Sequence, residues 1–259
     1  MPREDNFSVE EIKAHIVNKD LQNIPVFFYE ETDSTNTRAK LYDGNLENHV
    51  LFVANAQSAG RGRLGRKFHS LSGSGIYMSL LSVVKSDAID PALITVRAAV
   101  AVCRAIESLS KIKPKIKWVN DIIYNGKKLC GILTEGIIGD SGKVTKTVCG
   151  IGINVLKADL PEEIKEIAVS VEEACGVKLS RSALCARVLE EFLAPAPWNE
   201  IIAEYRRRST LIGKDVLVHK AECEPYSAKV LDIDERARLI VKLADGKEEL
   251  LYSGEVSVK

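Results

Sequence analysis

Short apolar runs separated by polar segments fill the first half of the chain, and this pattern predicts strands together with helices. Apolar runs flanked by polar residues predict strands at 26–29, 51–54 and 75–82. From Pro91 to about Lys111 the apolar residues recur every three or four positions, which is typical of a helix with one buried face. A mixed α and β domain is therefore expected.

An antiparallel meander is expected between residues 116 and 155. A strand at 116–119 is expected to continue through 121–124, and Asn125-Gly126 after it is typical of a type I′ hairpin turn. The return strand is expected at 128–136, and a tight turn at 140–142 leads into a third strand at 145–155. The pattern therefore predicts neighbouring strands joined by short turns.

The two ends of the chain differ from its middle. Residues 1–25 are polar and predict a leader with one short helix, which begins at Ser8 and carries Glu11 in a capping-box position. Further helices are expected at 37–42, 161–175, 180–193 and 198–208. Beyond Leu211, five short strands with turns at Asp245-Gly246 and Ser253-Gly254 predict a small β-barrel; the strands are expected at 216–218, 227–233, 239–243, 249–252 and 256–258. We therefore divide the chain into 1–25, 26–211 and 212–259.

Composition excludes several classes of protein. Lys+Arg and Asp+Glu both number 36 in 259 residues, and this balance argues against a general nucleic-acid binder, which usually has a basic excess. The six cysteines form no C-x-x-C pair and no secretory leader precedes them, so a reduced, cytoplasmic protein is expected. The four histidines lack ligand spacing, and the apolar runs are too short to span a membrane. We therefore expect neither a structural zinc site nor a membrane partner.

A basic, glycine-rich segment lies between two of the expected strands. Residues 60–67 hold three glycines and four basic side chains, and we call residues 59–74 the Gly/Arg loop. Glycine lets a backbone approach a ligand closely, and arginine matches carboxylate or phosphate with a planar fork of donors. A solvated basic turn would have the same composition. The position between two core strands favours a loop that binds a multiply anionic ligand.

Other polar clusters accompany this loop. They are Asp33 to Asn36 after the first strand, Gln57 before the loop, Lys117 to Asp121, Lys127 to Gly131, and Gly150 to Asn154. Each also has an ordinary structural interpretation. Ser, Thr and Asn commonly cap helices, and a lysine beside a hairpin is most often solvated. Glycines within a strand often mark the close approach of a ligand or of another backbone.

Taken together and in this order, these motifs resemble those of biotin protein ligases. The resemblance covers about residues 26–259 and includes Gly60 to Phe68, Lys128 to Leu133 and the C-terminal Gly254 to Val258. It implies an α+β fold with a class II aminoacyl-tRNA synthetase-like mixed sheet in 26–211 and an SH3-like barrel in 212–259. It also implies the use of ATP and Mg²⁺ to convert biotin into biotinyl-AMP. The biotinyl group then passes to a lysine of a biotin carboxyl carrier protein domain.

The resemblance also implies roles for individual residues. The biotin-binding set is Ser34, Thr35, Asn36, Gln57, Gly60, Arg61, Gly62, Arg63, Lys128 and Gly131. The ATP-binding set is Arg63, Arg66, Phe68, Asn120 and Asn154, and the catalytic set is Lys128, Arg61, Lys117 and Asp121. Lys128 would bridge the biotin carboxylate and the α-phosphate. Lys117 and Asp121 would face the phosphates and the metal ion.

Two positions depart from the family pattern. Phe68 stands where the family usually has Trp over the adenine, and Val119 stands in place of the usual Pro. Phenylalanine still stacks, with a smaller face. Two alternatives remain beside a single-function ligase: a biotin-sensing repressor that binds DNA, and a lipoate-type ligase. Neutral charge weighs against the first and the Gly/Arg loop against the second. A homodimer is compatible with the resemblance.

Overall fold

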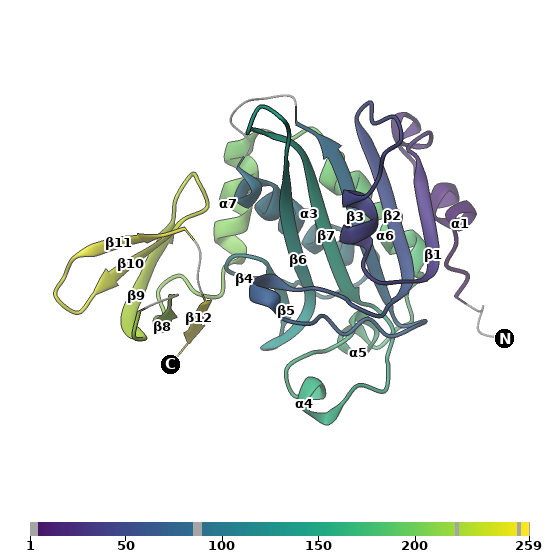
Figure 1. The fold of residues 1–259 in the computed structure, drawn as a ribbon. Helices are drawn as coiled ribbons and strands as arrows, with labels where there is room; N and C mark the ends of the chain where they lie inside the picture. Colours follow the sequence, from purple (N-terminus) through teal and green to yellow (C-terminus); the bar gives the residue numbers. More distant parts are fainter. Residues whose placement is uncertain (1–4, 85–89, 221–222, 253–254, 259) are drawn as a thin grey trace.

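The chain folds around two β-sheets that lie side by side (Figure 1). A computed structural model describes residues 5–84, 90–220, 223–252 and 255–258. The larger sheet holds seven strands and carries most of the helices, and the smaller sheet has five strands at the C-terminal end. The mixed α+β fold expected from the sequence is confirmed.

The larger sheet is mixed rather than wholly antiparallel. Its strands, in spatial order, are β1 (Val26–Thr32), β2 (His49–Gln57), β3 (Gly75–Val83), β7 (Val144–Asn154), β6 (Lys127–Ile138), β5 (Asp121–Tyr124) and β4 (Lys115–Lys117). β1 and β2 are parallel, and the other neighbours are antiparallel. The Gly/Arg loop therefore joins two adjacent strands near the middle of the sheet.

The expected meander is present, but the prediction of a single first strand is wrong. Instead of one strand through 116–124, β4 and β5 pair antiparallel with Lys117 opposite Asp121. The chain therefore reverses at residues 118–120, and the peptide bond between Trp118 and Val119 is cis. The next turn follows the expectation, because Asn125 and Gly126 both have positive φ, at 47° and 82°.

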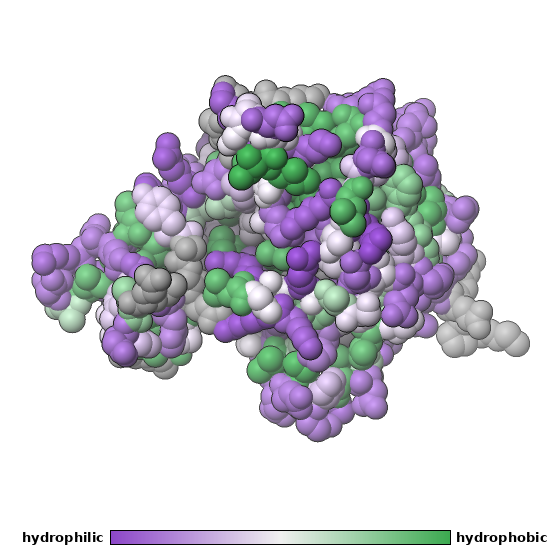
Figure 2. Space-filling view, in the orientation of Figure 1, coloured by the Kyte–Doolittle hydropathy of each residue, from purple (hydrophilic) through white to green (hydrophobic). Residues whose placement is uncertain are grey.

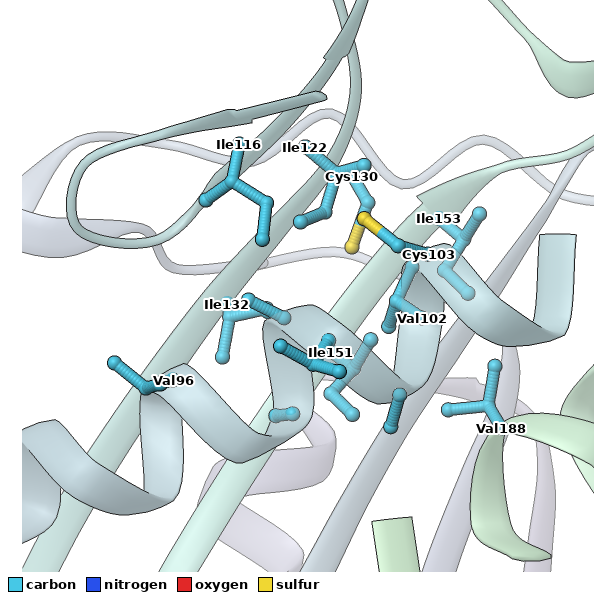
Figure 3. Packing of buried hydrophobic residues seen from close by; sticks show 14 of the residues in the cluster. Val96, Val102, Cys103, Ile116, Ile122, Cys130, Ile132, Ile151, Ile153 and Val188 are labelled. Carbon is cyan, nitrogen blue, oxygen red and sulfur yellow. The ribbon is translucent and has the colours of Figure 1, made fainter. Parts of the chain in front are cut away.

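Three helices cover one face of the larger sheet and bury its core (Figure 1). They are α3 (Pro91–Leu109), α6 (Arg181–Leu193) and α7 (Trp198–Arg208). Pro91 occupies the first turn of α3, where Asp90 accepts the amide of Ala92 at 2.8 Å. Side chains from α3, α6 and β4 to β7 converge in this layer (Figure 3). The apolar periodicity of residues 91–111 thus identified the central core helix.

The opposite face of the sheet carries one short helix, α2 (Thr35–Lys40). Strand residues alternate between the two faces, so Phe52 and Val148 pack with Ala39 of α2, while Leu51 and Cys149 belong to the core beneath α3. The expectation of a helix at 37–42 was displaced by two residues. Ser34 stands at the N-cap without a side-chain cap bond, and Thr35 already belongs to the first turn.

Two further segments pack beside this frame. The N-terminal segment forms α1 (Val9–His15) and the short helix η1 (Lys19–Leu21), and Ile12 is fully buried in the main core. The expected helix at 161–175 is instead two helices, α4 (Glu162–Lys165) and α5 (Val171–Cys175). The break follows from Ser170, which caps α5 in a capping box with Glu173. Among the described helices, none is long and apolar enough to cross a bilayer.

The C-terminal unit is a small antiparallel sheet. In spatial order it comprises β11 (Glu248–Leu251), β10 (Leu239–Leu243), β9 (Tyr226–Ile233), β8 (Asp215–His219) and β12 (Glu255–Val258). The indole N–H of Trp118 donates to the carbonyl of Ala237 at 2.8 Å, and that of Trp198 donates to Glu235 at 2.9 Å. The expected turn at Ser253-Gly254 lies outside the described residues. On the face in Figure 2, hydrophilic side chains predominate and hydrophobic ones lie in small groups.

Candidate active site

A cavity of about 630 Å³ opens where the Gly/Arg loop lies beside the strands of the larger sheet. The walls come from the loop, from α2, from the β4–β5 turn and from residues 160–168. Residues of β3, β6 and β7 also line it. Segments distant in the sequence therefore meet around one space, which is the usual form of a small-molecule site.

Glycines let other groups approach the strands closely in this cavity. Gly131 of β6 pairs with Gly152 of β7, and Gly150 lies two residues earlier on β7. A Cβ at Gly152 would stand 2.6 Å from the ring of Phe68, and a Cβ at Gly150 would stand 2.1 Å from Oδ1 of Asn36. These positions exclude side chains because neighbouring groups already occupy that space.

A buried polar network borders the start of α2. Ser79 of β3 donates its hydroxyl to Oδ1 of Asn36 at 2.6 Å or to Oγ1 of Thr35 at 2.7 Å. Gln57 accepts the backbone amide of Thr35 at 2.8 Å and donates to the hydroxyl of Ser70 at 2.9 Å. Because each member has a partner, this end of the cavity presents polar groups in fixed orientations.

The charged end of this network is Glu135. Its carboxylate accepts from the amide of Asn36 at 2.8 Å and from the ammonium of Lys40 at 2.5 Å. Burial alone would raise the pKa of Glu135, but these hydrogen bonds and the positive charge of Lys40 outweigh it, so the pKa lies below its usual value. Glu135 is therefore ionised at neutral pH, and its carboxylate accepts the hydrogen bond that orients Asn36.

An ion pair and a hydrogen-bonded arginine occupy another wall. The ammonium of Lys128 lies 2.7 Å from a carboxylate oxygen of Asp121. The guanidinium of Arg63 donates to Oδ1 of Asn120 at 3.2 Å, and Asn120 donates to the carbonyl of Ile132 at 2.9 Å. The positively charged side chains of Arg63, from the loop, and Lys128, from β6, therefore line the part of the cavity that the β4–β5 turn also lines.

The Gly/Arg loop folds back on itself as a distorted hairpin. Isolated bridges join Gln57 to Ser70 and Arg61 to Lys67. The side chain of Arg61 also donates to the hydroxyl of Thr37 in α2, at 2.6 Å. Leu64 lies near the tip with a left-handed φ of 54° and is 72% exposed. The loop is thus fastened at its base, while its tip remains open to solvent.

Most residues expected at a binding site line this cavity. They are Ser34, Thr35, Asn36, Gln57, Arg61, Gly62, Arg63, Arg66, Phe68, Lys117, Asn120, Asp121, Lys128, Gly131 and Asn154. Gly60 is absent from the lining. A Cβ there would stand 2.4 Å from the carbonyl oxygen of Phe68, so this glycine permits the loop to close on itself.

Sequence reasoning missed other wall residues. Tyr77 was assigned only to a strand, the lining residues of 164–168 only to a helix, and Leu160 to no element. The segment at 160–168 reaches the site because Lys128 donates its amide to Ile167 at 2.8 Å and its carbonyl accepts the amide of Val169 at 3.0 Å. His219 and Ser257 bring the C-terminal sheet to the cavity. No motif marked these contacts, except the family-like ending that includes Ser257.

The acidic groups at the cavity are few. Asp121 and Glu166 line it. Within residues 5–84, 90–220, 223–252 and 255–258, no group of three His, Cys, Asp or Glu residues is arranged to hold a metal ion. A divalent ion here would therefore need oxygen ligands from a bound anion.

Comparison with protein families gives two matches along the chain. The Biotin/lipoate A/B protein ligase family matches residues 28–154. The Biotin protein ligase C terminal domain matches residues 211–259. The first range contains all the expected site residues, and the second contains the small sheet that contributes His219 and Ser257.

Similar proteins include the bifunctional ligase/repressor BirA of Bacillus spizizenii, which is 40% identical over 86% of this chain and 70% of its own length. The biotin–[acetyl-CoA-carboxylase] ligase of Paracoccus denitrificans is 33% identical over 84% of this chain and 94% of its own. Among solved structures, a biotin protein ligase from Aquifex aeolicus in complex with biotin and ATP has a TM-score of 0.76 and 27% identity. The superposition covers 91% of this chain and 98% of the Aquifex aeolicus chain.

Proposed function

Because the chain belongs to the biotin protein ligase family, we propose that it uses ATP to convert biotin into biotinyl-5′-AMP and transfers the biotinyl group to a lysine of a biotin carrier domain. The observation that carries this proposal is the cavity in which the Lys128–Asp121 ion pair lies among basic residues of the Gly/Arg loop. The Aquifex aeolicus ligase with biotin and ATP supports it.

The first step joins two anions. A carboxylate oxygen of biotin attacks the α-phosphorus of ATP, and the bond to pyrophosphate breaks. Lys128 has three N–H donors, of which Asp121 uses one. A Cβ on Gly131 would stand 3.0 Å from its Nζ, so the ammonium lies over the glycine strands. We assign Lys128 to bridge the biotin carboxylate and the α-phosphate, where charge develops in the transition state.

The Gly/Arg loop supplies further cations. Arg61 reaches α2 through Thr37, and Arg63 reaches the β4–β5 turn through Asn120. Their guanidinium groups would replace these neutral partners, or share them, when carboxylate and phosphate enter. We therefore assign both arginines to the activated intermediate. The loop would exclude water from the acyl phosphate, which water can hydrolyse.

The two ends of the cavity suit different parts of the substrates. The uncharged side chains of Thr35, Asn36 and Gln57 offer both donors and acceptors, which suits the ureido head of biotin. Phe68 offers a stacking face and Asn154 an amide near the Lys128 backbone, to which it donates at 3.3 Å. We assign these two residues to the adenine side, with Arg66 nearby in the loop.

The residues fit a Mg²⁺ ion that arrives with ATP. Mg²⁺ prefers oxygen ligands and is usually held by one or two carboxylates together with substrate phosphates. Asp121 is the carboxylate beside Lys128 and would provide the protein ligand, with Lys117 as a neighbouring cation on the opposite strand. The bound ion would neutralise phosphate charge.

The second step transfers the acyl group. The amine of the acceptor lysine attacks the acyl carbon, loses a proton, and AMP leaves. We propose that the acceptor belongs to the carrier protein of a biotin-dependent carboxylase and that the reaction takes place in the cytoplasm. All six cysteines are free, as is typical of proteins in reducing compartments.

The direct test is transfer of labelled biotin. The purified chain is incubated with labelled biotin, Mg²⁺ and a carrier domain, with or without ATP. We expect ATP-dependent label on the carrier, and none on a carrier whose acceptor lysine is replaced by arginine. Transfer of lipoate in place of biotin would instead identify a lipoate-type ligase. A gel shift with biotinyl-AMP tests the repressor alternative.

A further inference from the structure

A buried arginine at the start of α6 binds the N-terminal segment. The side chains of Arg181 and Asp5 are only 5% and 8% exposed. Nε of Arg181 donates to one carboxylate oxygen of Asp5, and the backbone amide of Arg181 donates to the other at 3.2 Å. The guanidinium also lies 4.5 Å from the ring centre of Phe7. A charge this deeply buried is tolerated because it is paired and hydrogen-bonded.

The same guanidinium reaches the strands that flank the Gly/Arg loop. Nη1 of Arg181 donates to Oδ1 of Asn55 in β2 at 2.7 Å and to the carbonyl of Gly75 in β3 at 3.2 Å. Arginine can hold three acceptors in a fixed arrangement because its donors form a rigid, planar fork. Arg181 therefore joins α6 and the N-terminal segment to the ends of both strands.

Asn55 extends this connection into the loop itself. Its Oδ1 also accepts the amide of Gly73 at 3.1 Å, and its Nδ2 is 3.2 Å from the hydroxyl of Ser72. These contacts fix the end of the loop and the first residue of β3, which together we call the loop exit (residues 71–75). The loop exit thus depends on an asparagine that is itself oriented by Arg181.

The loop exit is continuous with the cavity. Tyr77, which lines the cavity, donates its hydroxyl to the carbonyl of Leu71 at 2.9 Å and packs edge-on against Phe68 at 6.3 Å between ring centres. The carbonyl of Ser74 accepts the amide of Val155 at 3.1 Å, directly after Asn154. A displacement of the loop exit would therefore move Phe68 and the wall near Asn154.

We propose that Arg181 is a positioning residue for the ligase reaction and that Asp5 is the counter-charge that keeps it in place. Through Asn55 and Gly75 it fixes the loop exit, so that the Gly/Arg loop closes over substrates from a defined end. The N-terminal segment, which the sequence indicated only as a polar leader, thereby takes part in the working of the site. This inference rests on the proposed function for its kinetic consequences.

The test compares the buried Asp5–Arg181 pair with a partly exposed ion pair elsewhere in the protein. Asp5→Asn removes the counter-charge of Arg181 with little change of shape. Glu107→Gln replaces a carboxylate in the same way where Glu107 of α3 meets Arg208 of α7 at 2.6 Å. Arg208 keeps Glu204 as a second carboxylate partner, at 2.6 Å, and Glu107 does not line the cavity, so this variant controls for the loss of one carboxylate charge away from the site. Asn55→Ser interrupts the connection while leaving the residues of both ion pairs in place, and it keeps the test decisive if Asp5→Asn fails to fold.

Each variant is examined by hydrogen exchange and by enzyme kinetics. Hydrogen exchange of the ligand-free protein reports the loop exit directly and requires no enzymatic activity. Release of biotinyl-AMP, together with kcat and KM for biotin and ATP, reports the consequence for the site. If the closed loop is populated less, apparent affinity falls in proportion, so we expect release to accelerate about fivefold or more while kcat stays within about twofold.

The expected result is faster exchange at residues 71–75 and faster release in Asp5→Asn and Asn55→Ser, but not in Glu107→Gln. Unchanged exchange in the first two variants, or an equal change in all three, would overturn the positioning role and leave Arg181 as a structural residue. If the wild-type protein failed to biotinylate a carrier, the proposed function would fail, while the exchange experiment would still decide whether Arg181 fixes the loop exit.

Discussion

The ammonium group of Lys128 lies 2.7 Å from a carboxylate oxygen of Asp121, across the neighbouring strands β5 and β6. Both side chains are about one third exposed, at 34% and 28%, so an anion entering the cavity can reach the ammonium without breaking the sheet. The pair therefore combines a fixed position with access, as a group that stabilises transition-state charge requires.

Replacing Lys128 with alanine should remove most of the adenylate-forming activity. One electrostatic contact made in the transition state is typically worth about 10²- to 10³-fold in rate. Pyrophosphate exchange in the presence of biotin measures this step. Lys127→Ala is the matched control, because its ammonium donates to the carbonyl of Lys165 at 2.8 Å and does not line the cavity. Normal exchange in Lys128→Ala would remove Lys128 from the catalytic set.

The Gly/Arg loop should gain protection when biotinyl-AMP binds. Five glycines and four basic residues lie between Gly60 and Gly75, so the empty loop is costly to order and its charges repel one another. The negatively charged acyl phosphate of this ligand would offset part of that repulsion. Hydrogen exchange with and without biotinyl-AMP is the measurement, with the β9–β10 pair as an internal reference. Equal protection of the loop in both states would contradict a role in closure.

Arg63→Gly should make the enzyme less selective while leaving adenylate synthesis measurable. Losing a charge-assisted contact costs roughly 1.5–3 kcal/mol and loosens the closed loop, so the adenylate should escape and acylate exposed lysines. A biotin blot of a bystander protein such as albumin detects this. Arg63→Lys keeps the charge and loses the planar fork. Its labelling of albumin should therefore lie between that of Arg63→Gly and that of the wild-type protein. Adenylate synthesis with label only on the carrier would reassign Arg63 to synthesis or structure.

A methyl group on Gly152 should impair the site without unfolding the protein. The added Cβ would stand 2.6 Å from the ring of Phe68, which must then move. Overpacking of this kind typically costs about 1–3 kcal/mol. We expect a raised KM for ATP. Gly136→Ala is the control: it lies in the same sheet, outside the cavity lining, and the atoms nearest its added Cβ would be the side-chain carbons of Val144, from 3.2 Å. Equal KM values in the two variants would contradict the prediction.

Glu135→Gln should destabilise the fold at neutral pH and much less in acid. The pKa of Glu135 is lowered in the folded state because hydrogen bonds from Lys40 and Asn36 outweigh the effect of burial. A lowered pKa stabilises the fold above the unfolded value, ~4.3 for glutamate, and this contribution is lost as pH falls through the folded pKa. Urea unfolding of both proteins between about pH 3 and 7 tests this. A difference that is independent of pH would show that Glu135 acts through packing alone.

Elements whose signals are local could be predicted from the order of residues alone. The apolar periodicity after Pro91 identified α3, and Asn125-Gly126 identified the β5–β6 turn, because helix faces and type I′ turns depend on neighbouring residues. The Gly/Arg loop and the motifs around Lys128 and Asn154 also contain many of the residues that line the cavity. Those motifs resembled a family, and the family match later bore that resemblance out.

Contacts between distant segments could be identified only in the folded chain. β4 and β5 form a hairpin rather than one strand, because pairing and the bond from Trp118 to Ala237 fix that reversal. The segment at 160–168 reaches the cavity because it bonds to the backbone of Lys128. Arg181 meets Asp5 across 176 positions of sequence. Such contacts depend on how the chain packs, and periodicity, which reports only residues near one another, does not contain that information.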